Sequence, residues 1–87
     1  METNNLATTR EDIKEWFEQG VKEGASHMIV MCDTFDWDDY PIYVTPPVDA
    51  RKTVEAKNGN NMQKVMEVYN LALPMEPQLD ERRAFNY

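Results

Sequence analysis

The clearest helical pattern in the chain lies between residues 8 and 24. Apolar residues recur there at helical spacing on an otherwise charged segment: Ile13, Trp16, Phe17, Gly20 and Val21. A capping box can begin the helix, and two pairs fit it: Thr8 with Glu11, or Thr9 with Asp12. Gly24 can end the helix, because glycine readily adopts the left-handed conformation of a C-terminal cap.

Two short apolar runs follow this helix and predict a β-hairpin. Residues 28–32 are apolar without alternation, which is typical of a strand that is buried on both faces. Residues 40–45 form the returning strand, with Pro41 near its start, where a missing amide does least harm. The connection lacks a glycine or an asparagine for a two-residue turn, so we expect a loop of four or more residues within 34–39.

The second half of the chain predicts two further helices. Prolines 46 and 47 can open a short helix that ends near residues 57–59. A second apolar stripe then predicts a helix over residues 62–73, with Pro74 as its end: Met62, Val65, Met66, Tyr69 and Leu73. Residues 78–83 can form a last helical turn before the aromatic end of the chain.

This order of elements predicts a small α+β domain, α-β-β-α(α), with an antiparallel hairpin packed on helices. Residues 8–87 form this single domain, and residues 1–7 form a flexible N-terminus. Two strands alone are marginally stable, and a strand that is apolar on both faces needs cover on both. A bare hairpin also leaves two unpaired strand edges. We therefore expect a homo-oligomer that completes the fold.

Composition and charge exclude several classes of function. The 87 residues carry a formal net charge of −7, whereas a general binder of nucleic acid or of anionic membranes needs a basic surface. We therefore expect neither direct nucleic-acid binding nor membrane binding. The single cysteine cannot form an internal disulfide, and no segment resembles a signal peptide or a membrane span. These features favour a cytoplasmic protein.

The sequence contains few candidate catalytic residues. The one histidine, His27, and the one cysteine, Cys32, lie five residues apart on one predicted strand, so their side chains point to opposite faces. No glycine-rich phosphate loop is present. We therefore expect a protein that is not an enzyme and that holds no cofactor.

Four carboxylates gather at the predicted loop of the hairpin and could offer oxygen ligands to a metal ion: Asp33, Asp36, Asp38 and Asp39. The calcium-loop pattern fails, because the sixth place counted from Asp36 is not glycine and the twelfth is Pro47. A solvated acidic loop is the simpler interpretation, and we expect no bound metal. A metal-dependent enzyme that uses residues 33–39 is the weakest alternative.

Two pairs of basic residues suit an anionic ligand: Arg51 with Lys52, and Arg82 with Arg83. The second pair lies close to Phe85 and Tyr87, a combination that can stack on a nucleobase and bind its phosphate. The alternative interpretation is a helix end at which the two arginines form ion pairs with Asp80 and Glu81 or with a partner chain.

The segments HMIVMCDTFDWDDYPIYV and NNMQKVMEVYNLAL, with the ending RRAFNY, resemble a family of small uncharacterised proteins of tailed bacteriophages and prophages. The family motif has the form CDTFDxxDYPxYV, and the resemblance covers residues 8–87. The family has no assigned activity, so no functional residue is carried over. The resemblance implies a cytosolic phage product, and such products frequently counter host defence by blocking a defence protein or by trapping a nucleotide signal.

Two functions follow as hypotheses. The first is a host-defence antagonist, a homo-oligomer that sequesters a nucleotide-like signal through the following residues: Trp37, Tyr40, Tyr43, Arg51, Lys52, Arg82 and Arg83. The second is an acidic protein-interaction module that blocks a basic host surface, such as one that binds nucleic acid, through Asp36, Trp37, Asp38 and Asp39. Trp37 is common to both, and in the second it is the expected anchor.

Overall fold

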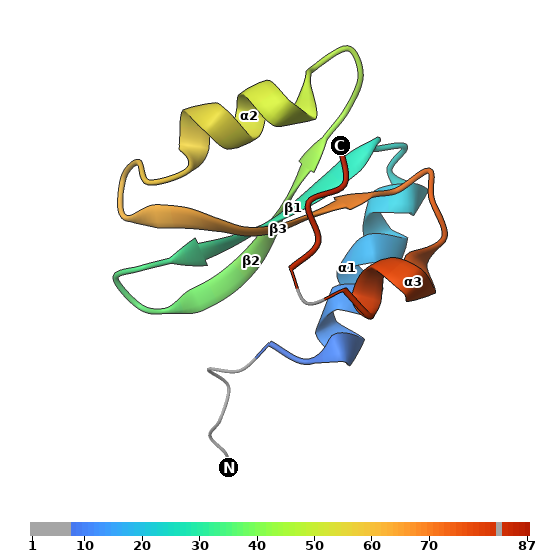
Figure 1. The fold of residues 1–87 in the computed structure, drawn as a ribbon, viewed down its shortest axis with the longest axis horizontal. Coiled ribbons are helices and arrows are strands. Elements are labelled where there is room, and N and C mark those ends of the chain that lie inside the picture. The colour runs from blue at the N-terminus through green and yellow to red at the C-terminus, as the bar shows by residue number, and fades with distance from the viewer. Residues whose placement is uncertain (1–7, 82) are drawn as a thin grey trace.

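The computed structural model describes residues 8–81 and 83–87. The expected flexible segment 1–7 and Arg82 lie outside the described residues. Along the chain the elements are α1 (Arg10–Lys22), β1 (His27–Asp33), β2 (Asp38–Val44), α2 (Ala50–Lys57), β3 (Gln63–Asn70) and α3 (Met75–Leu79). The strands form one antiparallel sheet in the order β2-β1-β3 (Figure 1). The predicted α+β class is confirmed.

Helix α1 begins at the second of the two predicted capping boxes. The Thr9 hydroxyl accepts a hydrogen bond from the Asp12 amide at 3.1 Å, and the Asp12 carboxylate accepts one from the Thr9 amide at 3.0 Å. The apolar stripe buries Ile13, Phe17 and Gly20. These contacts satisfy the amides at the helix start and direct one face of α1 towards the sheet.

The predicted hairpin is confirmed as β1 and β2, joined by a loop of residues 34–37. Each residue from His27 to Asp33 pairs with one of Asp38–Val44 in unbroken antiparallel register. Strand β2 lies at the edge of the sheet, which explains why Pro41, without an amide hydrogen, is tolerated within it.

The helix expected over residues 62–73 is wrong, because most of this segment forms strand β3. A bulge places Val65 opposite Met31 and Glu67 opposite Val30, and Met66 is the extra residue. Because of the bulge, Val65 and Val68, three residues apart, both face α2. Both faces of β3 are also buried, so its apolar residues imitate helical spacing. The open edge of β1 supplies the hydrogen bonds that decide the conformation.

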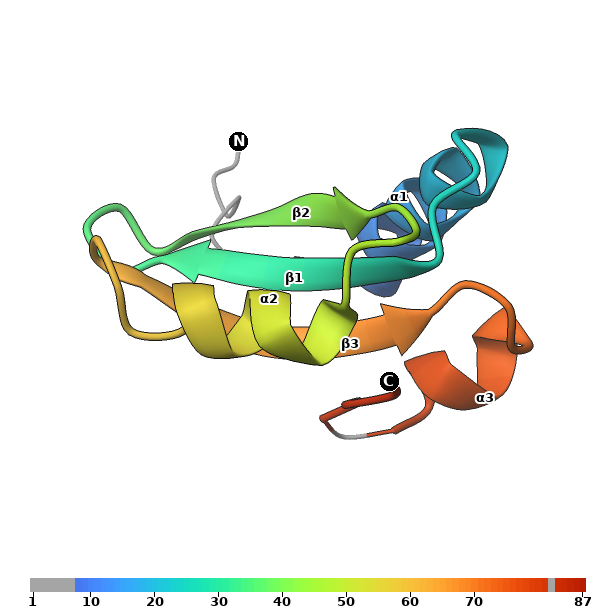
Figure 2. The ribbon, with the colours of Figure 1, turned by 90° about the horizontal axis from the view of Figure 1, so that it is seen from above.

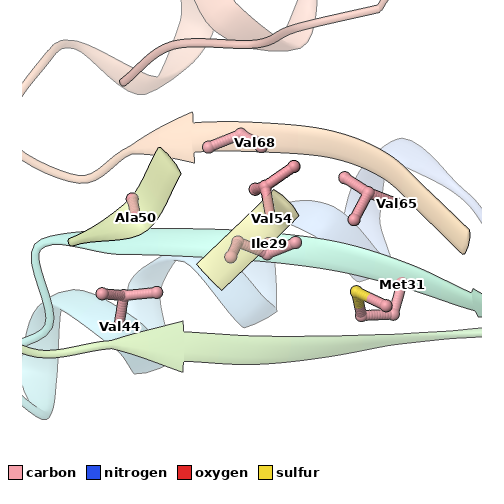
Figure 3. Packing of buried hydrophobic residues seen from close by; sticks show 7 residues of the cluster. All are labelled: Ile29, Met31, Val44, Ala50, Val54, Val65 and Val68. Carbon is pink, nitrogen blue, oxygen red and sulfur yellow. The ribbon is translucent and has the colours of Figure 1, made fainter. Parts of the chain in front are cut away.

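The sheet is covered on both faces by helices of the same chain. Helix α2 lies on one face, and α1 and α3 lie on the other (Figure 2). The cluster under α2 consists of Ile29, Met31, Val44, Ala50, Val54, Val65 and Val68 (Figure 3). The cluster under α1 consists of Ile13, Phe17, Met28, Val30, Tyr69 and Ala84. Strand β1 therefore obtains both its cover and its second neighbour within one chain. Self-association is not needed to complete this sheet, and the homo-oligomer stays a prediction.

The C-terminal segment lies along the outer edge of β3. The Val68 amide donates to the Ala84 carbonyl oxygen at 2.7 Å, and the Asn86 amide donates to the Val68 carbonyl oxygen at 3.0 Å. Helix α3 occupies Met75–Leu79, earlier than the turn expected over residues 78–83, with Pro77 inside its first turn, where proline is tolerated. No helix of the described residues is long and apolar enough to cross a membrane.

Candidate functional site

Two loops meet at one end of the sheet, and we call them together the tip: residues 34–37 between β1 and β2, and residues 58–62 between α2 and β3. Both views place them side by side, at the left in Figure 1 and Figure 2. The Met62 carbonyl oxygen joins them, because it accepts hydrogen bonds from the Thr34 amide at 2.8 Å and from the Thr34 hydroxyl at 2.9 Å. The tip is therefore one connected surface formed by segments far apart in sequence.

Large apolar side chains at the tip are exposed to solvent. The exposed fraction is 71% for Phe35, 60% for Trp37 and 58% for Met62. Single exposed apolar residues are common on proteins, but a group of this size at one place often marks a contact surface. The exposure of Trp37 agrees with its assignment to recognition in both hypotheses.

The backbone of the tip adopts conformations that side chains normally disfavour. Trp37, Asn61 and Met62 have φ values of 60°, 53° and 59°, and they are the only described non-glycine residues with positive φ. For Trp37 and Met62 such a conformation costs roughly 1–3 kcal/mol and persists only where surrounding contacts enforce it, whereas asparagine tolerates it. At Trp37 the enforcing contact is the hydrogen bond from its amide to the Asp33 carbonyl oxygen, at 2.6 Å.

Four carboxylates flank the aromatic side chains of the β1–β2 loop. Asp36 and Asp38 are exposed, whereas Asp33 and Asp39 are half-buried and hydrogen-bonded. The Asp33 side chain accepts from the Phe35 amide at 2.8 Å, and the Asp39 side chain accepts from the Thr8 hydroxyl at 2.6 Å. Within the described residues, no three acidic, histidine or cysteine side chains are arranged to hold a metal ion. The β1–β2 loop of the tip therefore carries exposed aromatic side chains with acidic neighbours on both sides.

The structure separates the three aromatic residues of the nucleotide hypothesis. Tyr40 packs on the α2 side of the sheet and donates to the Gln63 side chain at 2.5 Å. Tyr43 packs on the α1 side and donates to the Trp16 carbonyl oxygen at 2.8 Å. Burial raises the pKa of the Tyr43 hydroxyl. Trp37 lies at the tip. The three aromatic side chains therefore do not form a single stacking site within one chain.

The basic residues of that hypothesis are also dispersed. The Arg51 guanidinium lies 4.1 Å from the centre of the Tyr87 ring, at a pocket of about 390 Å³. Lys52 lines a different groove on α2, and Arg83 lines one on the opposite side of the sheet. The sequence indicated an arginine beside the terminal aromatics but assigned it to residues 82 and 83, and Arg82 itself is outside the described residues. The arginine that lies beside Tyr87 is instead Arg51, because the start of α2 and the C-terminal segment meet at this point.

A groove of about 620 Å³ lies between α1, α3 and the sheet, and its lining extends from Asp39 near the tip to Tyr69 near the other end of β3. Glu67 projects into it half-buried, and its carboxylate accepts a hydrogen bond from the Tyr69 hydroxyl at 3.1 Å. Burial raises the pKa of Glu67, the Asp39 charge raises it further, and the Tyr69 hydrogen bond and Arg83 lower it. The sequence did not indicate this residue, because its segment was interpreted as a helix.

His27 and Cys32 do not form a catalytic pair. The His27 ring contacts the Ser26 hydroxyl at 2.8 Å, and its Nε2 atom is buried without a hydrogen-bond partner among the described residues. Cys32 is buried at the other end of β1, and burial raises the pKa of its thiol. A raised thiol pKa disfavours the reactive thiolate. No protein-family model, curated protein or solved structure matches the chain.

Proposed function

We propose that this protein is a non-catalytic recognition module that binds a basic surface of a partner protein through its tip. The observation that supports this most directly is Trp37, which is 60% exposed on a constrained turn between Asp36 and Asp38. Exposed tryptophans are frequent anchors of protein interfaces when a polar rim surrounds them. The strained turn presents the indole before the partner arrives, which reduces the ordering cost of binding.

The charges of the tip complement a partner rich in lysine and arginine. Carboxylates around an apolar centre attract such a surface and align it, and they repel acidic competitors. Phe35 and Met62 extend the apolar centre beyond Trp37, and Met62 adds a side chain that adapts to different shapes. The resemblance to phage proteins suggests the cytoplasm of an infected bacterium as the location and a host protein as the partner.

The experiment is affinity capture from bacterial lysate, followed by a binding measurement with each captured protein in purified form. Trp37→Ala and Asp38→Lys are expected to lower the affinity at least tenfold, since loss of an interface anchor costs about 2 kcal/mol or more. Phe85→Ala and Glu18→Lys are the matched controls, because both residues are exposed, Phe85 beside β3 and Glu18 on α1, which lies towards the end of the sheet opposite the tip. Raising the salt concentration should weaken the wild-type interaction.

Equal binding by wild type, Trp37→Ala and Asp38→Lys would exclude the tip as the binding surface. Binding that depends on Phe85 or Glu18 instead would assign recognition to the C-terminal segment or to α1. Circular dichroism of each variant checks that the fold is retained.

Sequestration of a nucleotide-type signal is a second candidate function, and the Arg51–Tyr87 contact favours it. The pocket beside this contact is lined by His27 and by the start of α2, so a stacked base and a bound anion could both be placed there. Calorimetry with cyclic nucleotides and ADP-ribose derivatives tests it, with Arg51→Met as the variant that loses binding. The absence of heat with every compound would end this candidate.

A further inference from the structure

The groove between α1, α3 and the sheet, which contains Glu67, can form a second part of the proposed interface. We propose that it receives one arginine or lysine side chain from the same partner that the tip engages. This inference rests on the proposed function. It adds the requirement that the partner carries an arginine or a lysine close to the residues with which it contacts Trp37.

The floor and walls of the groove suit such a side chain. Apolar atoms of four residues form its floor: Ile13, Met66, Tyr69 and Leu79. The aliphatic stem of an arginine or a lysine packs well on such a surface, while its charged end needs a polar wall. The carboxylates of Asp39 and Glu67 both line the groove and supply this wall.

The charges that line the groove favour a cation. The described residues of its lining contribute three carboxylates, of Asp39, Glu67 and Glu81, and two guanidinium groups, of Arg10 and Arg83. The Arg10 guanidinium is already bound to Glu76 at 2.8 Å and to Asp80 at 2.9 Å. A half-buried carboxylate such as that of Glu67 interacts more strongly with an incoming charge than an exposed one does.

The position of the groove connects it to the tip. Asp39 lines the groove and lies only two residues beyond Trp37 along the chain, at the start of β2. Helices α1 and α3 lie towards the opposite end of this face, so the tip end of the sheet is less covered (Figure 2). A partner segment that crosses Trp37 can therefore place its next basic side chain between Asp39 and Glu67.

Small probes test the groove without the partner. n-Butylguanidinium reproduces the end of an arginine side chain, and n-butylurea is its neutral isostere. In an NMR titration of the full chain, the guanidinium is expected to shift the signals of Met66, Glu67 and Tyr69, and the urea is not. Glu67→Gln is expected to weaken this binding at least tenfold, whereas Glu55→Gln, with the same change in net charge on α2, leaves it unchanged.

Equal shifts with the charged and the neutral probe, or unchanged binding by Glu67→Gln, would overturn the inference. The titration is independent of the capture experiment, so the two failures are distinguishable. If Trp37→Ala abolishes partner binding and no cation enters the groove, the tip is retained and the groove is rejected. If the cation binds but Trp37→Ala does not weaken partner binding, the groove is a cation site that is separate from any interface at the tip. The proposal that it receives a side chain of the tip's partner then fails.

Discussion

The hydroxyl and the amide of Thr34 both donate hydrogen bonds to the carbonyl oxygen of Met62, at 2.9 Å and 2.8 Å. One carbonyl therefore connects the β1–β2 turn with the loop that enters β3. Trp37 and Met62, which both have positive φ, lie on either side of this connection. The apolar centre of the proposed interface is assembled by the contact between two loops.

Thr34→Val removes the hydroxyl and retains the shape of the side chain. We expect the free energy of unfolding to fall by about 0.5–1.5 kcal/mol, the usual net value of one hydrogen bond. We also expect faster amide hydrogen exchange in residues 34–37 and at Met62. Thr53→Val is the control, because the Thr53 hydroxyl donates to the carbonyl oxygen of Asp49, the N-cap of α2, and not to either loop of the tip. Unchanged exchange in Thr34→Val would show that other contacts hold the two loops together.

Gly20→Ala should destabilise the protein. Gly20 lies within α1, and replacing a glycine inside a helix with alanine normally stabilises a protein by about 0.5–1 kcal/mol. A Cβ atom at position 20 would lie 2.7 Å from the Leu71 side chain and 2.8 Å from the Tyr43 ring. The Tyr43 ring is held by its hydrogen bond to Trp16, so it cannot easily move away. We expect a loss of about 1–3 kcal/mol in urea unfolding, as for other overpacked sites.

Val21→Ala is the control for this substitution, because Val21 occupies the neighbouring helix position and is 51% exposed. It should change stability by a few tenths of a kcal/mol at most, through helix propensity alone. A Gly20→Ala protein that is as stable as wild type would mean that Leu71 relaxes enough to accept the methyl group.

Glu67 should make stability depend on pH in an identifiable direction. Burial raises the pKa of its carboxyl above the ordinary value of 4.5, so the folded chain binds this proton more tightly than the unfolded chain does. Its contribution to stability is full below pH 4.5 and is lost as the pH rises through the folded pKa. Between pH 4 and pH 7, therefore, wild type should lose more unfolding free energy than Glu67→Gln does.

Denaturant unfolding at several pH values measures this difference. Glu55→Gln removes a carboxylate from an exposed position on α2 and serves as the control for a change in net charge. Parallel pH profiles of wild type and Glu67→Gln would contradict the assigned pKa direction.

Gln78 connects α3, β3 and the C-terminal segment through its buried amide. Its Oε1 atom accepts from the Asn70 amide at 2.8 Å and from the Asn86 side chain at 3.0 Å, and its Nε2 atom donates to the Asn70 carbonyl oxygen at 2.9 Å. Gln78→Met fills a similar volume but leaves these groups unpaired, at a cost of about 1–3 kcal/mol for each buried group.

We expect the Gln78→Met protein to unfold at lower denaturant concentration and to be cleaved faster by proteases near residues 83–87. Gln19→Met is the control, since Gln19 is an exposed residue of α1 whose side chain donates a hydrogen bond to the Glu23 side chain of the same helix end. Equal protease resistance of Gln78→Met and wild type would show that the remaining contacts, those of Val68 with Ala84 and Asn86 and those of Tyr87, hold the C-terminal segment.

The candidate surface was only partly predictable from sequence. Trp37 and its neighbouring aspartates were identified from composition, because aromatics among carboxylates on a loop stand out in a short chain. Met62 was assigned to a helix, so its place beside Thr34 was missed. Glu67 was missed for the same reason, since the groove exists only when β3 pairs with β1.

The sequence by itself determined helix α1 and the β1–β2 hairpin. A capping box, a terminal glycine and an unbroken apolar run act over a few residues, so these elements follow from local preferences. Only the tertiary structure decided the conformation of residues 63–70, because the edge of β1 that pairs with them is distant in sequence and the bulge at Met66 disguises the alternation of a strand. The same pairing covered the hairpin from within the chain, brought Met62 to Thr34 and formed the groove that contains Glu67.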